Sequence, residues 1–171
     1  MRHMPPPTLL DRFLRAESWW LVRGESGALW PTLFHPRGVI AHGRLVPRFP
    51  EDADLETRER AMLVLDSFGQ KEVNDFNDVM DEGDVIITPD AGSRSAWFGV
   101  VTSPWFAAAD CEHWIQRRCD WHPAAVPLTP EATDLLPRTP QGTVFNVSRA
   151  KPVLMRCLTK AAGTSDSLPH R

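Results

Sequence analysis

The 171-residue chain contains no tyrosine, only three cysteines and no long apolar run. The odd number of cysteines and the absence of a CxxC pair argue against a disulfide framework and a zinc knuckle. No segment approaches the roughly 20 apolar residues of a membrane-spanning helix. The N-terminal sequence MRHMPPPT also lacks the apolar core of a signal peptide. The sequence therefore predicts a cytoplasmic protein.

Basic residues are too few for a protein that holds nucleic acid by charge alone. The formal net charge is −3, whereas binding through phosphates needs many lysine and arginine contacts. The charge is unevenly spread: residues 1–90 carry 10 basic and 16 acidic side chains, and residues 91–171 carry 9 and 6. A nucleic-acid surface is therefore expected to draw on the second half of the chain.

Residues with catalytic chemistry do not form a recognisable pattern. The six histidines make no HxxxH or HxH motif, and no glycine-rich phosphate loop is present. His113 lies near Asp110 and Glu112, with Cys111 or Cys119 as a conceivable nucleophile, but neighbouring residues of a strand face opposite ways. We therefore expect no enzymatic activity, no metal and no cofactor.

The predicted elements indicate one domain with more strands than helices. Thr8 is expected to cap a short helix to Arg15, and two further helices are expected from Asp54 and over residues 71–80. Strands are expected over residues 19–23, 38–41, 84–88, 95–102, 113–121 and 143–147. Five or six short strands with a helical pair inserted after the second predict a small α+β barrel rather than a parallel α/β sheet.

Five segments in a fixed order carry a family resemblance. They are WLVRGESG (20–27), FNDVMDEGDVIITPD (76–90), WFGVVTSPW (97–105), RRCDW (117–121) and GTVFNV (142–147). In this order they resemble the N-terminal module of Mrr-type restriction proteins, a PUA-like domain related to the EVE and YTH folds. The resemblance implies a PUA-like pseudobarrel over residues 19–148. Residues 1–18 would form a tail and short helix, and residues 149–171 a C-terminal extension whose last eleven residues are flexible.

Members of that superfamily hold a nucleobase, often modified and flipped out of its strand, in an aromatic pocket. Stacking in such a pocket offsets the cost of extruding the base. The resemblance implies stacking surfaces from Trp97, Trp105 and either Trp19 or Trp20, which point to opposite faces of a strand, and contacts to base edges from Arg23 and Glu25. Contacts to the nucleic-acid backbone are expected from Arg44, Arg94, Arg117 and Arg118. Each tryptophan could equally be a core residue, and Arg23 could simply pair with Glu25 in a turn.

The chain departs from the family pattern in two places. A Gly-Trp pair follows the second strand in the family, whereas this chain has His42, Gly43 and Arg44, so a cation replaces one aromatic wall. The sequence after Val147 leaves no room for the nuclease domain of the restriction proteins. We therefore predict a sensor of a modified DNA base in a restriction or phage-defence setting, with an effector protein such as a nuclease acting in trans. The alternatives are a protein-interaction or regulatory domain that binds no base, and an RNA reader.

Overall fold

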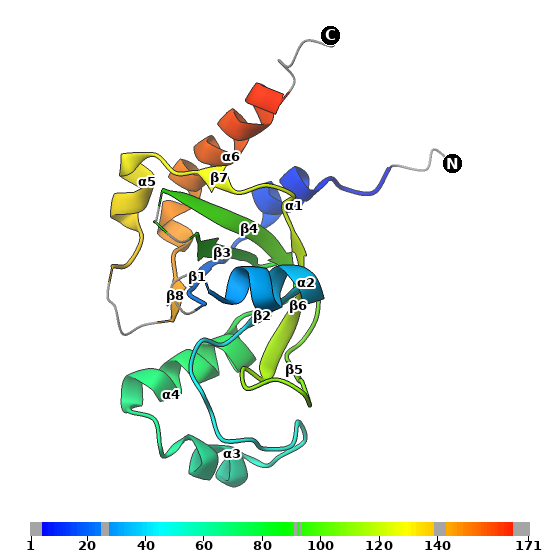
Figure 1. The fold of residues 1–171 in the computed structure, drawn as a ribbon, viewed down its shortest axis with the longest axis vertical. Coiled ribbons are helices and arrows are strands. Elements are labelled where there is room, and N and C mark those ends of the chain that lie inside the picture. Colours follow the sequence, from blue (N-terminus) through cyan, green and yellow to red (C-terminus); the bar gives the residue numbers. More distant parts are fainter. Residues whose placement is uncertain (1–4, 25–27, 91, 93, 139–142, 166–171) are drawn as a thin grey trace.

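A computed structural model of the chain describes residues 5–24, 28–90, 92, 94–138 and 143–165 (Figure 1). The elements in chain order are α1 (Leu9–Arg15), β1 (Trp19–Val22), η2 (Trp30–Phe34), α2 (His35–Arg37), β2 (Val39–Ala41), α3 (Leu55–Met62), α4 (Ser67–Asn74), η3 (Asp75–Val79), β3 (Val85–Pro89), β4 (Ser95–Val101), β5 (Phe106–Ala107), β6 (Ile115–Trp121), β7 (Val126–Pro127), α5 (Pro130–Leu135), β8 (Val144–Asn146), η4 (Ser148–Ala150) and α6 (Lys151–Ser165). None of the helices in these described ranges is both long and apolar enough to cross a bilayer.

The eight strands form one curled sheet in the order β2-β6-β4-β3-β1-β8, with β5 added beside β6 and β7 beside β4. Only β1 and β3 run parallel, with Trp20 opposite Ile86, and every other pairing is antiparallel. This mixed sheet confirms the predicted α+β class. The first strand lies inside the sheet, because β1 pairs with β3 on one side and with β8 on the other.

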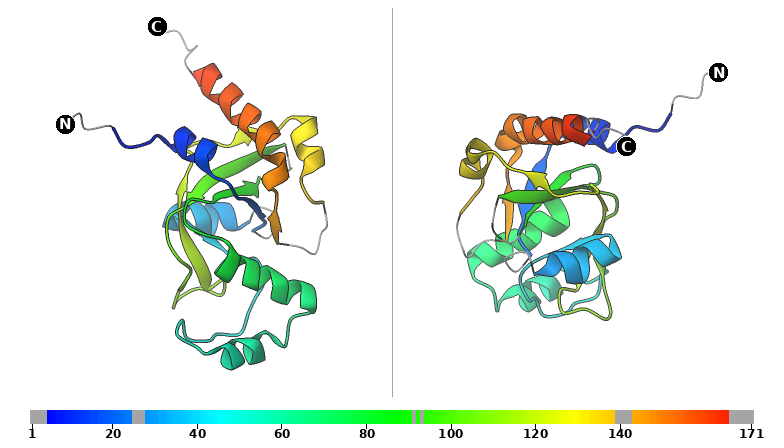
Figure 2. Two further views of the ribbon diagram at one scale, coloured as in Figure 1. Left: turned by 180° about the vertical axis from the view of Figure 1, so that it is seen from behind. Right: turned by 45° about the horizontal axis from the view of Figure 1, so that its top comes forward.

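Alternation along the central strands divides the core into two halves. Trp19 and Leu21 of β1 face a cluster that also contains Phe98, whereas Trp20 and Val22 face the other cluster. Helices α1 and α6 cover the first face, and the η2–α2 segment packs on the other side of the sheet (Figure 2). Both faces of the sheet are therefore covered by protein.

The predicted helical pair is present between β2 and β3. Asp54 and Asp66 are the N-caps of α3 and α4, and each carboxylate accepts a backbone N–H three residues further on. The inner face of this unit is fixed by buried Met62, Val73 and Phe76. We refer to residues 51–84 as the helical insert.

Three parts of the fold differ from the sequence prediction. The sheet has eight strands rather than five or six, because β5 and β7 are two-residue strands too short to give an alternating pattern. Helix α6 continues to Ser165, past the start of the predicted tail at Ala161. The helix expected over residues 71–80 begins earlier, as α4 at Ser67, and its second half, residues 75–79, is π-helical.

Candidate functional site

The tryptophans expected to line one pocket are divided between the two core clusters, with Trp19 in one and Trp20, Trp97 and Trp105 in or against the other. Trp19 is fully buried between the sheet and α1, and its ring contacts those of Phe13 and Phe98. Trp20 points to the opposite face, where its Nε1 donates a hydrogen bond to Asp84 at 2.9 Å. Neither indole is therefore available as a stacking surface for a base.

Trp97 and Trp105 have partners of their own. Trp97 stacks on Trp30 with ring centroids 4.0 Å apart and an angle of 12° between the planes, so this face is already occupied by an indole. Trp105 packs edge-on against Phe49 and Trp114. Trp20, Trp97 and Trp105 share one core cluster, but each is engaged by a partner of its own, and Trp19 lies across the sheet, so the four indoles do not line one pocket.

Arg117 is buried and holds protein backbone, which corrects its predicted contact to nucleic acid. Its guanidinium donates to the carbonyl groups of Phe76, Asn77, Met80 and Ser103 at 2.7–3.1 Å. Burial lowers its pKa, opposed by the acidic residues nearby. Arg117 therefore fastens the helical insert to β6.

The other predicted backbone contacts do not form one surface. Arg94 and Arg118 are both exposed, but Arg94 precedes β4, whereas Arg118 hydrogen-bonds through its carbonyl to Thr102 beyond the other end of that strand. Eight residues of extended chain span roughly 26 Å. Arg94 and Arg118 are therefore too far apart to contact the backbone of the same short nucleic-acid segment. Glu25 lies outside the described residues.

Arg23 and Arg44 do come close, through an array of rings. The Arg23 guanidinium lies 5.5 Å from the ring centroid of Phe145, and the Arg44 guanidinium lies 5.9 Å from that of Phe68. The two phenylalanine rings are 6.2 Å apart. We call these four residues the arginine–phenylalanine rim. It joins the ends of β1 and β2 to α4 and β8, and Phe68 is 40% exposed.

The buried carboxylate of Glu72 lies next to the rim and accepts hydrogen bonds from it and from the start of β8. It accepts a hydrogen bond from Arg44 Nε at 2.5 Å and from the backbone N–H groups of Thr143 and Val144. The side chain is only 2% exposed, so its oxygens rely on these donors and not on solvent for hydrogen bonds. Glu72 therefore fixes the position of Arg44 relative to the first residues of β8.

Two buried polar atoms beside Glu72 have no hydrogen-bond partner among the described residues: Nε2 of His42 and Oγ1 of Thr143. Burial lowers the pKa of His42 to about 4, with Glu72 opposing that shift, so the ring is neutral at pH 7. Its Nδ1 accepts the Arg44 backbone N–H at 3.1 Å, which places the proton on Nε2. This region therefore offers an imidazole N–H donor and a hydroxyl, and buried groups of this kind are normally paired.

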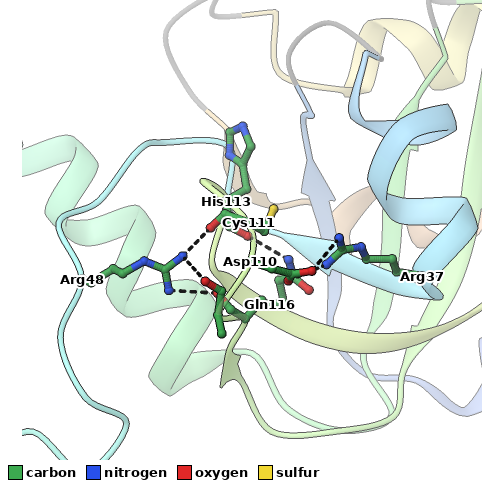
Figure 3. A network of polar contacts seen from close by, with 8 residues as sticks. Arg37, Arg48, Asp110, Cys111, His113 and Gln116 are labelled. Carbon is green, nitrogen blue, oxygen red and sulfur yellow. Dashed lines mark hydrogen bonds and ion pairs between the residues drawn. The ribbon is translucent and has the colours of Figure 1, made fainter.

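The loop between β5 and β6 lies beside His42 and is held by an arginine on each of two sides (Figure 3). Arg48 donates to the carbonyl groups of Ala108, Ala109 and Cys111, and Arg37 makes a two-pronged ion pair with Asp110. His113, at the end of this loop, has its Nδ1 3.1 Å from the His42 carbonyl oxygen. The β5–β6 loop is thus a fixed support for the end of β2.

These contacts also involve Asp110 and His113, which the sequence suggested as an acid–base cluster. The Asp110 carboxylate is engaged by Arg37, whose hydrogen bond lowers the pKa of Asp110, and His113 is buried against β2. Asp110 and His113 are therefore not arranged as a catalytic pair. Among the described residues no group of three or more His, Cys, Asp or Glu is placed to hold a metal ion.

Phe68, Glu72 and Phe145 were not expected from the sequence as site residues. One signal was available: Glu72 lies four residues before the buried Phe76, on the face of the helix that enters the core. A carboxylate at such a position needs buried donors. Its partners, at residues 44, 143 and 144, are too distant in sequence to be identified from the pattern.

Comparison of the chain with protein-family models, with curated proteins and with solved structures found no match.

Proposed function

We propose that this chain is a nucleic-acid recognition module that holds a DNA base, most often a modified one, at the arginine–phenylalanine rim. The observation that carries the proposal is the array Arg23–Phe145–Phe68–Arg44 directly beside buried polar groups that lack partners. The predicted ligand class is thus kept, but the site moves from the tryptophans to the rim.

The chemistry of the rim suits a flipped base. A base that stacks on an aromatic ring gains roughly 1–3 kcal/mol, and arginine can stack on a base or neutralise a phosphate. The His42 N–H and the Thr143 hydroxyl would meet polar atoms on the base edge. A base that satisfied both would also remove the cost of leaving these buried groups unpaired.

The resemblance to PUA-like modules supplies the proposed setting. Under this proposal the chain recognises the base and a separate effector protein acts on the nucleic acid, as a sensor in restriction or phage defence. The described residues Phe68 and Arg44 would take the place of the aromatic wall that the family pattern carries after the second strand.

Fluorescence anisotropy with short labelled oligonucleotides tests the proposal. DNA with unmodified, methylated, hydroxymethylated or glucosylated bases should be titrated at two salt concentrations, with matching RNA. We expect selective binding of one modified DNA. Phe68→Leu should weaken that binding about tenfold, because a stacking loss of about 1.4 kcal/mol corresponds to that factor.

Phe106→Leu is the matched control, because Arg118 likewise lies over the Phe106 ring, 5.3 Å from its centroid, and neither residue belongs to the rim. Equal effects of the two substitutions would remove the rim from the site. Preference for RNA would replace DNA as the ligand, and indifference to every oligonucleotide would overturn base recognition altogether.

A further inference from the structure

The helical insert differs from the rest of the chain in its charge. Residues 51–84 contain twelve acidic and three basic side chains, a balance of −9, whereas all other residues together contain ten acidic and sixteen basic ones, a balance of +6. The three basic side chains are themselves paired within the insert: Arg58 with Asp78, Arg60 with Glu56 and Lys71 with Asp75. The insert is therefore a strongly negative part of a protein whose remainder is positive.

The same segment also exposes a concentration of large apolar side chains. Leu55, Leu63, Val64 and Val79 are 69%, 72%, 71% and 58% exposed, and together with Phe68 of the rim they are five of the eight large hydrophobic residues exposed in the described part of the chain. The inner face of the insert is already filled by a separate set of buried residues. An amphipathic helical unit needs one apolar face to join its domain, so the outward set is not needed to hold the insert to the sheet.

The insert is held firmly enough to present a defined surface. Arg58 lies over the rings of Phe49 and Trp105, and Arg117 takes three carbonyl groups at the end of η3. Figure 1 shows α3 at the end of the molecule opposite α6, and Figure 2 agrees. A partner could thus reach α3 without contacting the helices on the other side of the sheet.

The charge decides what kind of partner fits. Nucleic acids and anionic membranes carry negative charge and would be repelled by the acidic surface around α3, whereas at the rim Arg23 and Arg44 place positive charge beside Phe145 and Phe68. A protein segment with basic residues around apolar ones would instead be attracted by the carboxylates and could cover the exposed leucine and valine side chains. We propose that the helical insert docks a basic, amphipathic segment of a partner protein. This inference goes beyond the proposed base recognition and does not depend on it.

A synthetic peptide can test the docking surface with the full-length protein. The probe is an 18-residue helix-forming peptide of leucine and lysine with leucine at helical spacing. Two controls replace all leucines by serine or all lysines by glutamate. In calorimetric titrations at low and high salt, we expect the leucine–lysine peptide to bind at least tenfold more tightly than either control, with salt weakening the binding.

Matched substitutions locate the binding on the protein. Leu63→Ser with Val64→Ser should reduce affinity about tenfold, whereas Leu14→Ser with Leu135→Ser, at exposed leucines outside the insert, should leave it unchanged. Glu59→Gln with Glu82→Gln should weaken binding more than Glu17→Gln with Glu112→Gln, which removes the same charge elsewhere. All eight positions are exposed, so the variants should fold, as circular dichroism can verify.

Three results would overturn the proposal: equal losses from insert and control variants, binding that does not require leucine in the peptide, or self-association of the chain that is abolished by the insert substitutions. The last would make a second copy the occupant. Oligonucleotide binding by the same variants should be unchanged, so failure of the docking surface can be told apart from failure of base recognition.

Discussion

Glu72 on α4 accepts the backbone N–H of Val144, the first residue of β8, at 3.0 Å. A side chain of the helical insert thereby accepts a hydrogen bond from an edge strand of the sheet. The same carboxylate accepts from Arg44 Nε. One buried acidic group thus joins the insert, the residue after β2 and the last strand.

Replacement of Glu72 by alanine should destabilise the protein by about 3–5 kcal/mol, since Arg44 and two backbone N–H groups would lose their acceptor in a buried place. Urea unfolding measures the change. Glu56→Ala, at an exposed i,i+4 pair with Arg60, should cost at most about 0.5 kcal/mol. A similar small cost at Glu72 would contradict its structural role.

Two adjacent arginines should respond differently to the same substitution. Arg117→Lys removes a planar guanidinium that serves four carbonyl groups, and lysine cannot reproduce that geometry, so we expect a loss of about 3 kcal/mol or more. Arg118→Lys, at an exposed position, should change the free energy of unfolding by less than about 0.5 kcal/mol. Chemical denaturation of the two variants side by side checks this, and equal losses would be inconsistent with the burial of Arg117.

Stability should fall as the pH drops from about 6.5 to 4. The pKa of His42 is about 4 in the folded protein, below its ordinary 6.5, because burial disfavours the charged ring. The unfolded chain therefore binds a proton first, and the stability present above pH 6.5 is lost by about 3 kcal/mol as pH falls through this window. His42→Gln should flatten the pH dependence of unfolding, whereas His122→Gln should not. An unchanged slope in His42→Gln would exclude His42 as the source.

Gly99 of β4 lies where a side chain has no room. An added Cβ would be 2.4 Å from the Cys119 sulfur and 2.8 Å from the Trp121 ring, so Gly99→Ala should destabilise by about 2 kcal/mol or more. Gly163→Ala in α6 meets no atom within 4 Å and should leave the melting temperature unchanged or raise it slightly. Calorimetric melting of both variants tests the contrast, which would be absent if β4 and β6 could separate to admit a methyl group.

Local patterns in the sequence were sufficient for much of the fold. Thr8 and Asp54 were expected at the starts of helices, and both accept the backbone N–H that defines an N-cap. Adjacent residues of a strand point to opposite faces, and the two core clusters confirm this for Trp19 and Trp20. These features depend on a few neighbouring residues and are therefore visible in the sequence.

The site depends on contacts between distant residues, and there the sequence was insufficient. The covering of both sheet faces by helices, α6 among them, determines that Trp19 is core and not pocket wall, and nothing near residue 19 indicates this. Arg117 and Arg118 have the same side chain, yet alternation along β6 buries one and exposes the other. The partners of Glu72 lie about 30 residues before it and 70 after it.

The position of β1 between β3 and β8 has a consequence for synthesis. A nascent chain makes β1 early, but both neighbouring strands follow the helical insert, and β8 comes near the end. Until the ribosome has delivered Val144, one edge of β1 has no strand to pair with. Products truncated before that residue would keep this edge open, and open strand edges recruit other chains. Strand β8 thus protects the first strand from aggregation.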